Sequence, residues 1–319
     1  MSSEQRKTLP PEAMDNAEAV IKALHRQGES LSRYDLSLLH LEKLHWERAP
    51  LQRCRLVGVY LEEAELVEAD LEGAVLARAH LEGVVFRGAR LCGADLSGAC
   101  LQGADLSRAD LRGACLRAAR LEGASLAGAI LDEADLREAD LSRADLREGS
   151  LRETLAEGAC FKEALLDRAT LHWAILGRAS LQRASLKEAD LHRANLVGAD
   201  LQGADLSQAS LLRTRPGSAN FRGALLIGTD CTLSILRQVN LREATLEQVN
   251  LSNATLDRAN LRGAVLRRLL FRRTNLVNAD LRGATVEIEG IDFGETNWWN
   301  AYWDDAIRSQ LEARFPRPE

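Results

Sequence analysis

Leucine recurs at every fifth position through most of this chain. From Leu51 to Val286 there are 48 positions at this spacing, and 40 of them are Leu. A second column lies two residues before each of these positions, and 36 of its 48 residues are Ala. The frame has no insertion over this range, and weaker matches at Leu31, Leu36 and Leu41 place the start of the repeat near residue 31.

A period of five fits neither a straight helix nor a straight strand. On an α-helix each repeat rotates the Leu side chain by roughly 140°, which scatters the Leu residues around the axis. On a strand, an odd period sends successive Leu side chains to opposite faces. The Ala and Leu of one repeat can share one side of a short extended segment if the chain turns a corner before the next segment. Repeated corners therefore predict a coil with Leu and Ala inside, whose stacked backbones pair as in a parallel β-helix.

The repeat units also resemble a known sequence motif. ADLEG at 69–73, ADLSG at 94–98, ADLSR at 104–108 and ANLVG at 194–198 are similar to the A(D/N)LXX motif of the pentapeptide-repeat family. The resemblance covers about four fifths of the chain. It implies an all-β fold, a right-handed quadrilateral parallel β-helix with four pentapeptides in each coil and about 12 coils in all.

The two ends of such a solenoid expose apolar layers and unpaired backbone groups, so each end needs a cap. Residues 10–27 predict a capping helix, because an apolar stripe that includes Met14 and Ile21 follows Pro10 and Pro11. The predicted parts are an N-terminal capping helix in residues 1–30, the β-helix in residues 31–291 and a C-terminal aromatic capping or dimerisation helix in residues 292–319.

The C-terminal segment carries large apolar residues at steps of three or four, which predicts an unusually bulky amphipathic helix. This helix is either a lid on the last coil or a dimer contact. In the topoisomerase-protecting members of the family a C-terminal helical segment joins two solenoids, so the resemblance is compatible with a homodimer. The candidate cap or dimer residues are Trp299, Tyr302, Trp303, Ile307, Leu311 and Phe315.

Composition narrows the class of protein. Apolar residues make up 46% of the chain, enough for a continuous core, but no run approaches the roughly 18 apolar residues of a membrane helix. The start of the chain has no apolar signal segment, so we expect a cytoplasmic protein without a membrane partner. The six cysteines form no Cys-x-x-Cys pair, which argues against a disulfide framework or a structural zinc site.

No catalytic motif stands out. The chain has no phosphate-binding loop, no His-Glu-x-x-His and no Gly-x-Ser-x-Gly elbow, and its many Asp residues belong to the repeat. His172 and His192 are four pentapeptides apart and should stack on neighbouring coils, but no third metal ligand is evident. We therefore expect no enzyme activity, no cofactor and no metal site.

Two pentapeptides break the consensus within the frame. Ala156 and Pro216 replace Leu in the column. Because Pro cannot donate a hydrogen bond to a ladder, we expect a local bulge or bend there.

Charge is uneven along the chain, whose net charge is −6. Residues 51–150 carry 18 acidic and 12 basic side chains, whereas residues 151–250 carry 11 and 12. A basic stretch follows between Arg258 and Arg273. The most concentrated acidic cluster, the candidate partner-binding site, consists of Glu62, Glu63, Glu65, Glu68, Asp70 and Glu72.

The expected function is therefore that of a protein-binding solenoid. Several bacterial members of the family bind DNA gyrase or topoisomerase IV, imitate duplex DNA and protect the enzyme from poisons. The resemblance and the acidic cluster suggest the same DNA-mimicking role here, with a type II topoisomerase as partner and no direct contact with nucleic acid. The alternative is a general scaffold or adaptor that does not bind a topoisomerase. The modest net charge and the basic stretch favour this alternative, because they fit a DNA mimic poorly.

Overall fold

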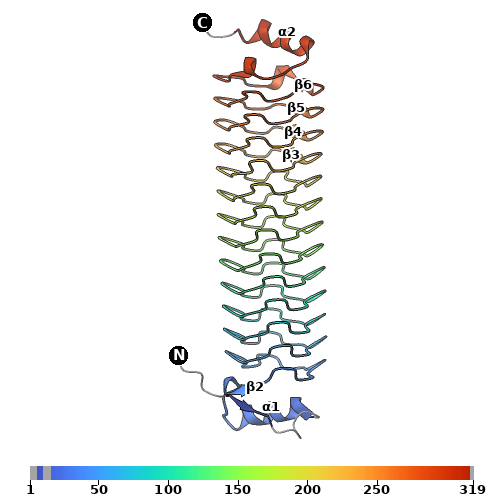
Figure 1. The fold of residues 1–319 in the computed structure, drawn as a ribbon, viewed down its shortest axis with the longest axis vertical. Helices are drawn as coiled ribbons and strands as arrows, with labels where there is room; N and C mark the ends of the chain where they lie inside the picture. Colours follow the sequence, from blue (N-terminus) through green and yellow to red (C-terminus); the bar gives the residue numbers. More distant parts are fainter. Residues whose placement is uncertain (1–5, 10–15, 317–319) are drawn as a thin grey trace. The chain divides into compact units, whose positions relative to one another are not determined.

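The computed structural model describes residues 6–9 and 16–316 of the chain. These residues form two compact units, which divide between Ala159 and Cys160. Unit 1 comprises residues 1–159 and unit 2 comprises residues 160–319. Both units are built from the same kind of coil (Figure 1).

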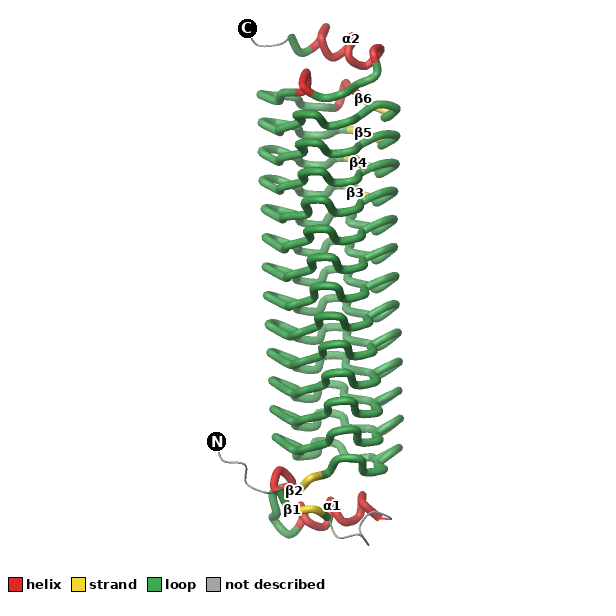
Figure 2. The backbone as a smooth tube through the Cα atoms, viewed as in Figure 1, coloured by secondary structure: helices red, strands yellow, loops and turns green. Residues whose placement is uncertain are grey.

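Each coil in both units contains four pentapeptides. Parallel backbone bridges pair the residue before a core Leu with the equivalent residue four pentapeptides later, as in Asp70 with Arg90 in unit 1 and Asp190 with Ser210 in unit 2. Hydrogen bonds between coils accompany these bridges; the amide of Leu111, for example, donates to the carbonyl of Ile130 at 2.7 Å. The backbone turns a corner after every pentapeptide (Figure 2). The predicted right-handed quadrilateral parallel β-helix is therefore confirmed.

The Leu and Ala columns form the core of each unit. Leu111 and Ala109 in unit 1, like Leu201 and Ala204 in unit 2, have no exposed surface. Burying one Leu side chain contributes about 1.5 to 3 kcal/mol, so the core constrains these columns and leaves the outward positions free to vary. Four phenylalanines that replace Leu in the column are also fully buried: Phe86, Phe161, Phe221 and Phe271.

The fifth residue of each pentapeptide makes the corner. Gly83 and Arg108 lie there with φ angles of 65° and 58°, in the left-handed region. Glycine adopts this conformation without the steric penalty of a Cβ atom. Many corners nevertheless carry Arg or Glu, so the corner positions add long charged side chains to the surface.

On one side of unit 2 the coils pair through strands of three residues instead of single-residue bridges. Four strands follow each other in a parallel sheet, with Leu226 opposite Leu246 and Leu246 opposite Leu266. These strands are β3 (Leu225–Ile227), β4 (Thr245–Glu247), β5 (Val265–Arg267) and β6 (Thr285–Glu287). In unit 1, β1 (Lys7–Thr8) pairs in parallel with β2 (Tyr34–Asp35).

The N-terminal helix forms as predicted over its described part. Helix α1 (Ala17–Arg26) buries Ala17 and Ile21, and the 3-10 helix η2 (Leu31–Arg33) follows it. Pro10, Pro11 and Met14 lie outside the described residues. No helix in the described part of the chain is long and apolar enough to span a bilayer.

The prediction of a C-terminal aromatic helix over residues 292–319 is wrong in length. Helix α2 spans only Asp305–Arg314 and is preceded by the 3-10 helices η3 (Ile288–Gly290) and η4 (Trp298–Asn300). Of the six predicted helix residues, Ile307 and Leu311 alone lie on α2.

The aromatic residues before α2 instead continue the coil. Tyr302 pairs in parallel with Asp280, and Leu270 pairs with Asp292, so the spacing here is longer by two positions than in the regular coils. This lengthening shifts the frame, and the steps of three and four in the sequence then imitate a helical period. The ring N–H of Trp303 donates to the carbonyl of Trp298 at 2.9 Å, which fixes this last coil.

Pro216 lies in the core column of unit 2 and changes the coil less than expected. The Arg215 bridge to Asn195 is present, and the regular pairing resumes between Asn220 and Asn240. The spacing stays at four pentapeptides on both sides, so no residue is inserted as a bulge would require. The proline removes one amide donor from the ladder without a change of register.

Candidate interaction surfaces

The four-pentapeptide coil determines which outward residues lie together. In each pentapeptide the central Leu points inward, and the residues before and after it point outward. Residues four pentapeptides apart stack on one face, whereas residues one pentapeptide apart lie on adjacent faces. A charged patch therefore has to be sought at equivalent positions of successive coils.

The predicted acidic cluster does not form a single surface. Glu62 and Glu63 belong to the face of Leu61, Glu65 and Glu68 belong to the next face, and Asp70 and Glu72 belong to the third. The six carboxylates thus extend around three of the four faces of one coil.

Most of these carboxylates also have basic neighbours. The Glu63 carboxylate lies 3.6 Å from Lys43, Glu65 lies 3.4 Å from His45, and Glu68 lies 2.8 Å from Arg48. Arg90 binds both Asp70, at 3.1 Å, and Glu72, at 2.7 Å. Exposed pairs of this kind add little stability, but they reduce the negative potential of the surface. Among the six carboxylates, Glu62 alone forms no ion pair with a described residue.

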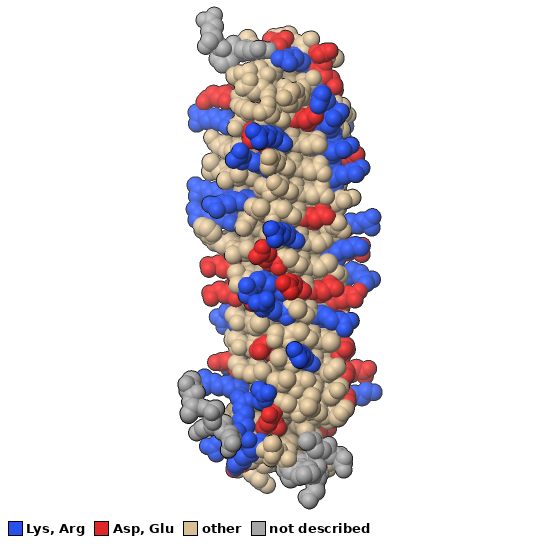
Figure 3. All heavy atoms as spheres, viewed as in Figure 1, with Lys and Arg blue, Asp and Glu red and all other residues tan. Residues whose placement is uncertain are grey.

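The basic stretch of the sequence is likewise distributed over several faces. Arg267, Arg272 and Arg273 have carboxylate partners in Glu287, Asp292 and Glu295. On the side of the molecule drawn in Figure 3, red and blue side chains lie next to each other on many coils. Neighbours in sequence therefore do not form a uniformly charged field in either unit.

A basic surface that the sequence analysis missed lies on one face of unit 2. It consists of the residues that directly follow the core residue on this face in successive coils. The bridges Asn220–Asn240, Asn240–Asn260 and Asn260–Asp280, one residue before the core, fix the register of these coils. On this one face, no acidic residue directly follows the core residue in any coil between Phe161 and Leu281. The residues of this basic column are Lys162, Gln182, Gln202, Arg222, Arg242, Arg262 and Arg282.

Part of the basic column is free of ionic partners. Neither Lys162 nor Arg242 forms an ion pair with a described residue. Arg262 lies 3.8 Å from Asp280, whereas Arg282 binds the same carboxylate closely, at 2.7 Å. The pKa of Asp280 lies below its ordinary value, chiefly because the Arg282 side chain donates hydrogen bonds to it.

The first half of the basic column borders a surface groove. This groove has a volume of about 540 Å³ and is open to solvent. Gly203 and Gly223 line it without side chains, and the Arg222 side chain in its lining donates two hydrogen bonds of 3.1 Å to Glu243. Its remaining lining residues are Lys162, Gln182, Arg183 and Gln202.

The predicted cap or dimer residues differ in their exposure. Trp303 and Leu311 are buried, and Tyr302 is half exposed. Trp299 and Phe315 line an apolar hollow of about 690 Å³, and the Phe315 ring contacts Phe293 with 5.2 Å between centroids. The buried residues pack as a lid would, and the homodimer stays a prediction.

His172 and His192 stack on neighbouring coils as predicted, with ring centroids 5.7 Å apart. Nε2 of His172 forms a hydrogen bond of 2.6 Å with the carboxylate of Asp190, and Arg193 lies over the ring of Trp173. Burial and the nearby positive charge of Arg193 lower the pKa of His192.

The chain is similar to several solved structures and to one family model. No curated sequence matches the chain. Among solved structures, HetL from the cyanobacterium Nostoc sp. strain PCC 7120, a pentapeptide repeat protein involved in heterocyst differentiation regulation, is 27% identical. The match covers 89% of this chain and 96% of HetL, with a TM-score of 0.41. QnrB1, a plasmid-mediated fluoroquinolone resistance protein, is 19% identical over 64% of this chain and all of QnrB1, with a TM-score of 0.35.

A third similar structure is a pentapeptide repeat protein from the Arabidopsis thaliana thylakoid lumen. It is 31% identical over 36% of this chain and 70% of its own, with a TM-score of 0.23. The family evidence comes from sequence: the model "Pentapeptide repeats" matches residues 54–91, 75–113, 114–152, 174–211, 218–253 and 250–287. Because these segments cover more than half of the sequence and coincide with the observed coils, the chain belongs to the pentapeptide-repeat family.

Proposed function

We propose that this protein is a non-catalytic scaffold that binds an acidic segment of a partner protein along the basic column of unit 2. The observation that carries the proposal is the occurrence of Arg222, Arg242, Arg262 and Arg282 at the same outward position of successive coils. The core requires no basic residue there, because these side chains point into solvent.

The spacing of the basic column suits an extended partner. Adjacent coils of a β-helix lie about 4.8 Å apart, so the guanidinium groups form a row along the coil axis. Each guanidinium can hold a carboxylate with two parallel hydrogen bonds, which a lysine cannot do. An extended acidic segment that runs along the column would therefore meet one arginine in each of the four coils from Arg222 to Arg282, and the groove beside Gly203 and Gly223 would admit its backbone.

Unpaired charge provides the driving force for the first encounter. Arg242 and Lys162 are not neutralised by described carboxylates, so they contribute fully to the local potential. Attraction between exposed charges is screened over about 8 Å at physiological salt, so it accelerates association more than it adds affinity.

Titration with a fluorescein-labelled poly-glutamate peptide, followed by fluorescence anisotropy, tests this proposal. The double variant Arg242→Glu/Arg262→Glu should bind the peptide at least about tenfold more weakly than the parent. The matched control Arg178→Glu/Arg258→Glu changes the net charge equally on a different face and should bind like the parent. Equal weakening by both variants would mean that net charge alone attracts the peptide, and the proposal would fail.

A DNA-mimicking topoisomerase binder is the second candidate. The observation in its favour is a column of carboxylates in unit 1, in which Glu42, Glu62 and Glu82 follow each other on one face. If this role is correct, the protein should protect DNA gyrase from a quinolone in a supercoiling assay, and Glu62→Lys/Glu82→Lys should abolish protection. Protection that survives this change, or no protection by the parent protein, would favour the scaffold.

A further inference from the structure

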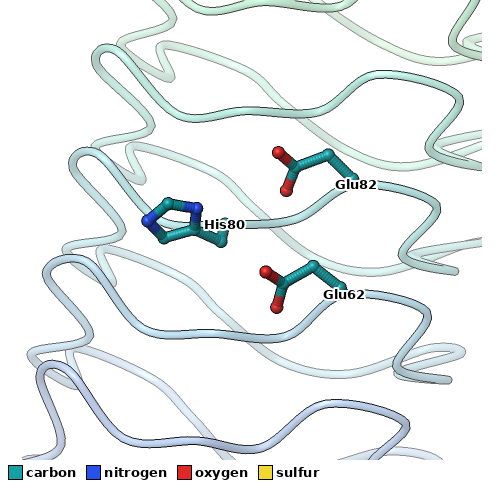
Figure 4. Close-up of side chains that lie close together, drawn as sticks. All are labelled: Glu62, His80 and Glu82. Carbon is teal, nitrogen blue, oxygen red and sulfur yellow. The ribbon is translucent and has the colours of Figure 1, made fainter.

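Glu62, His80 and Glu82 form a compact cluster on one face of unit 1. His80 and Glu82 flank the buried Leu81 within one pentapeptide, and Glu62 lies one coil earlier at the position equivalent to Glu82. One ligand atom from each residue can be chosen so that all three lie within 4.8 Å of one another. The two carboxylates lie one above the other, and the imidazole ring lies to one side of them (Figure 4).

Both carboxylates in this cluster have an unsatisfied oxygen. Oε2 of Glu62 and Oε2 of Glu82 are completely buried, and neither has a hydrogen-bond partner in the described part of the chain. A buried polar atom without a partner costs about 1 to 3 kcal/mol, and more when the group is charged. Two carboxylates stacked in this way also repel each other. The arrangement therefore lacks a positively charged group between them.

No described side chain supplies that charge. Neither carboxylate forms an ion pair with a described residue, and the nearest outward lysine of the same face, Lys43, lies 3.6 Å from Glu63 instead. The ring nitrogens of His80 likewise have no hydrogen-bond partner among the described residues. All three side chains are thus available as ligands.

The surroundings hold the imidazole in place. The ring of His80 stacks on Tyr60 with 4.4 Å between centroids, and Tyr60 stacks on His40 at 4.3 Å. The planes of each pair are within 7° of parallel. This three-ring stack restricts the rotation of His80 and keeps its edge beside the two carboxylates.

We propose that Glu62, His80 and Glu82 bind one divalent transition-metal ion, with zinc as the best match. One imidazole and two carboxylates are typical zinc ligands, and three protein ligands leave the fourth tetrahedral position for water. The ion neutralises the stacked carboxylates and satisfies both buried oxygens. It also links two successive coils, so it stabilises the beginning of unit 1 when it is bound.

Equilibrium dialysis against Zn²⁺ under reducing conditions tests the site. The parent protein should bind one Zn²⁺ that His80→Ala and Glu62→Gln each weaken at least about tenfold. Glu122→Gln is the matched control, because Glu122 has the same outward position two coils after Glu82, lies outside the cluster and pairs with Arg143. It removes the same charge as Glu62→Gln and should bind zinc like the parent.

Cobalt(II) provides a second readout that separates this site from the cysteines. Co²⁺ bound to nitrogen and oxygen should show visible absorption bands without the near-ultraviolet band of thiolate ligation, and His80→Ala should remove the visible bands. Circular dichroism spectra of the variants should match that of the parent, which shows that they fold. The proposal is wrong if His80→Ala binds zinc as tightly as the parent, if Glu122→Gln weakens binding as much as Glu62→Gln, or if the cobalt spectrum reports thiolates.

Discussion

Leu111 and Arg112 are neighbours in sequence, yet their side chains point in opposite directions: Leu111 has no exposed surface, whereas the Arg112 side chain is 60% exposed. Leu111→Asp should therefore destabilise unit 1 by about 4 kcal/mol or more, because it places an unpaired carboxylate in an apolar core. Arg112→Ala should cost less than about 1 kcal/mol, since it removes only an exposed ion pair with Asp110. Urea unfolding followed by circular dichroism measures both, and similar effects of the two changes would contradict the inward assignment of Leu111.

Buried hydroxyl groups in the Ala column should contribute measurable stability. Thr229 is 1% exposed, and its Oγ1 donates to the carbonyl of Leu206 in the preceding coil at 2.9 Å. Thr229→Val keeps the shape but loses this hydrogen bond, so we expect a loss of about 1 kcal/mol. The outward Thr255→Val is the control and should have little effect. An unfolding free energy that is equal for both variants would show that the hydroxyl is dispensable.

Stability should fall in acid. Hydrogen bonds from the Arg112 side chain are the main reason that the pKa of Asp110 falls from 3.8 to about 2. A carboxyl whose pKa is lower in the folded state stabilises the fold above its unfolded pKa, and this contribution is lost as the pH falls through the folded pKa. Arg137 and Arg147 lower the pKa of Asp135 and Asp145 by the same kind of contact.

The loss should therefore occur between about pH 4 and pH 2, with nearly constant stability from pH 7 to pH 5. The urea midpoint of the parent should therefore be lower at about pH 2 than at about pH 4. Asp110→Asn should show a smaller difference between these two midpoints than the parent. A parent protein that loses stability above pH 5 would point to groups other than these aspartates.

The core was predictable because its sequence signal repeats in every coil. The alternation that buries Ala109 and Leu111 recurs throughout, so the inward columns could be identified without any knowledge of the corners. The number of pentapeptides in a coil came from the family resemblance, since a period of five does not itself say how many corners close a turn. The longer spacing between Asp280 and Tyr302 could not be foreseen, because the aromatic residues there also fit a helical period.

The surfaces were harder to predict for a geometric reason. Glu62 and Glu68 are close in sequence but lie on different faces, whereas Arg222 and Arg242 are far apart in sequence and lie on the same face. Comparison of residues one coil apart would have revealed the basic column and the pairing of Glu62 with Glu82. His80 joins these carboxylates because it lies two residues before Glu82 with only the inward Leu81 between them.

Arginine footprinting with phenylglyoxal tests the central claim, that the basic column of unit 2 recognises an acidic partner, most directly. Modification of each arginine is measured by mass spectrometry with and without the poly-glutamate peptide. The peptide should protect Arg222, Arg242, Arg262 and Arg282 and leave Arg178 and Arg258 as reactive as before. Equal protection of all six, or protection of Arg178 and Arg258 alone, would contradict it.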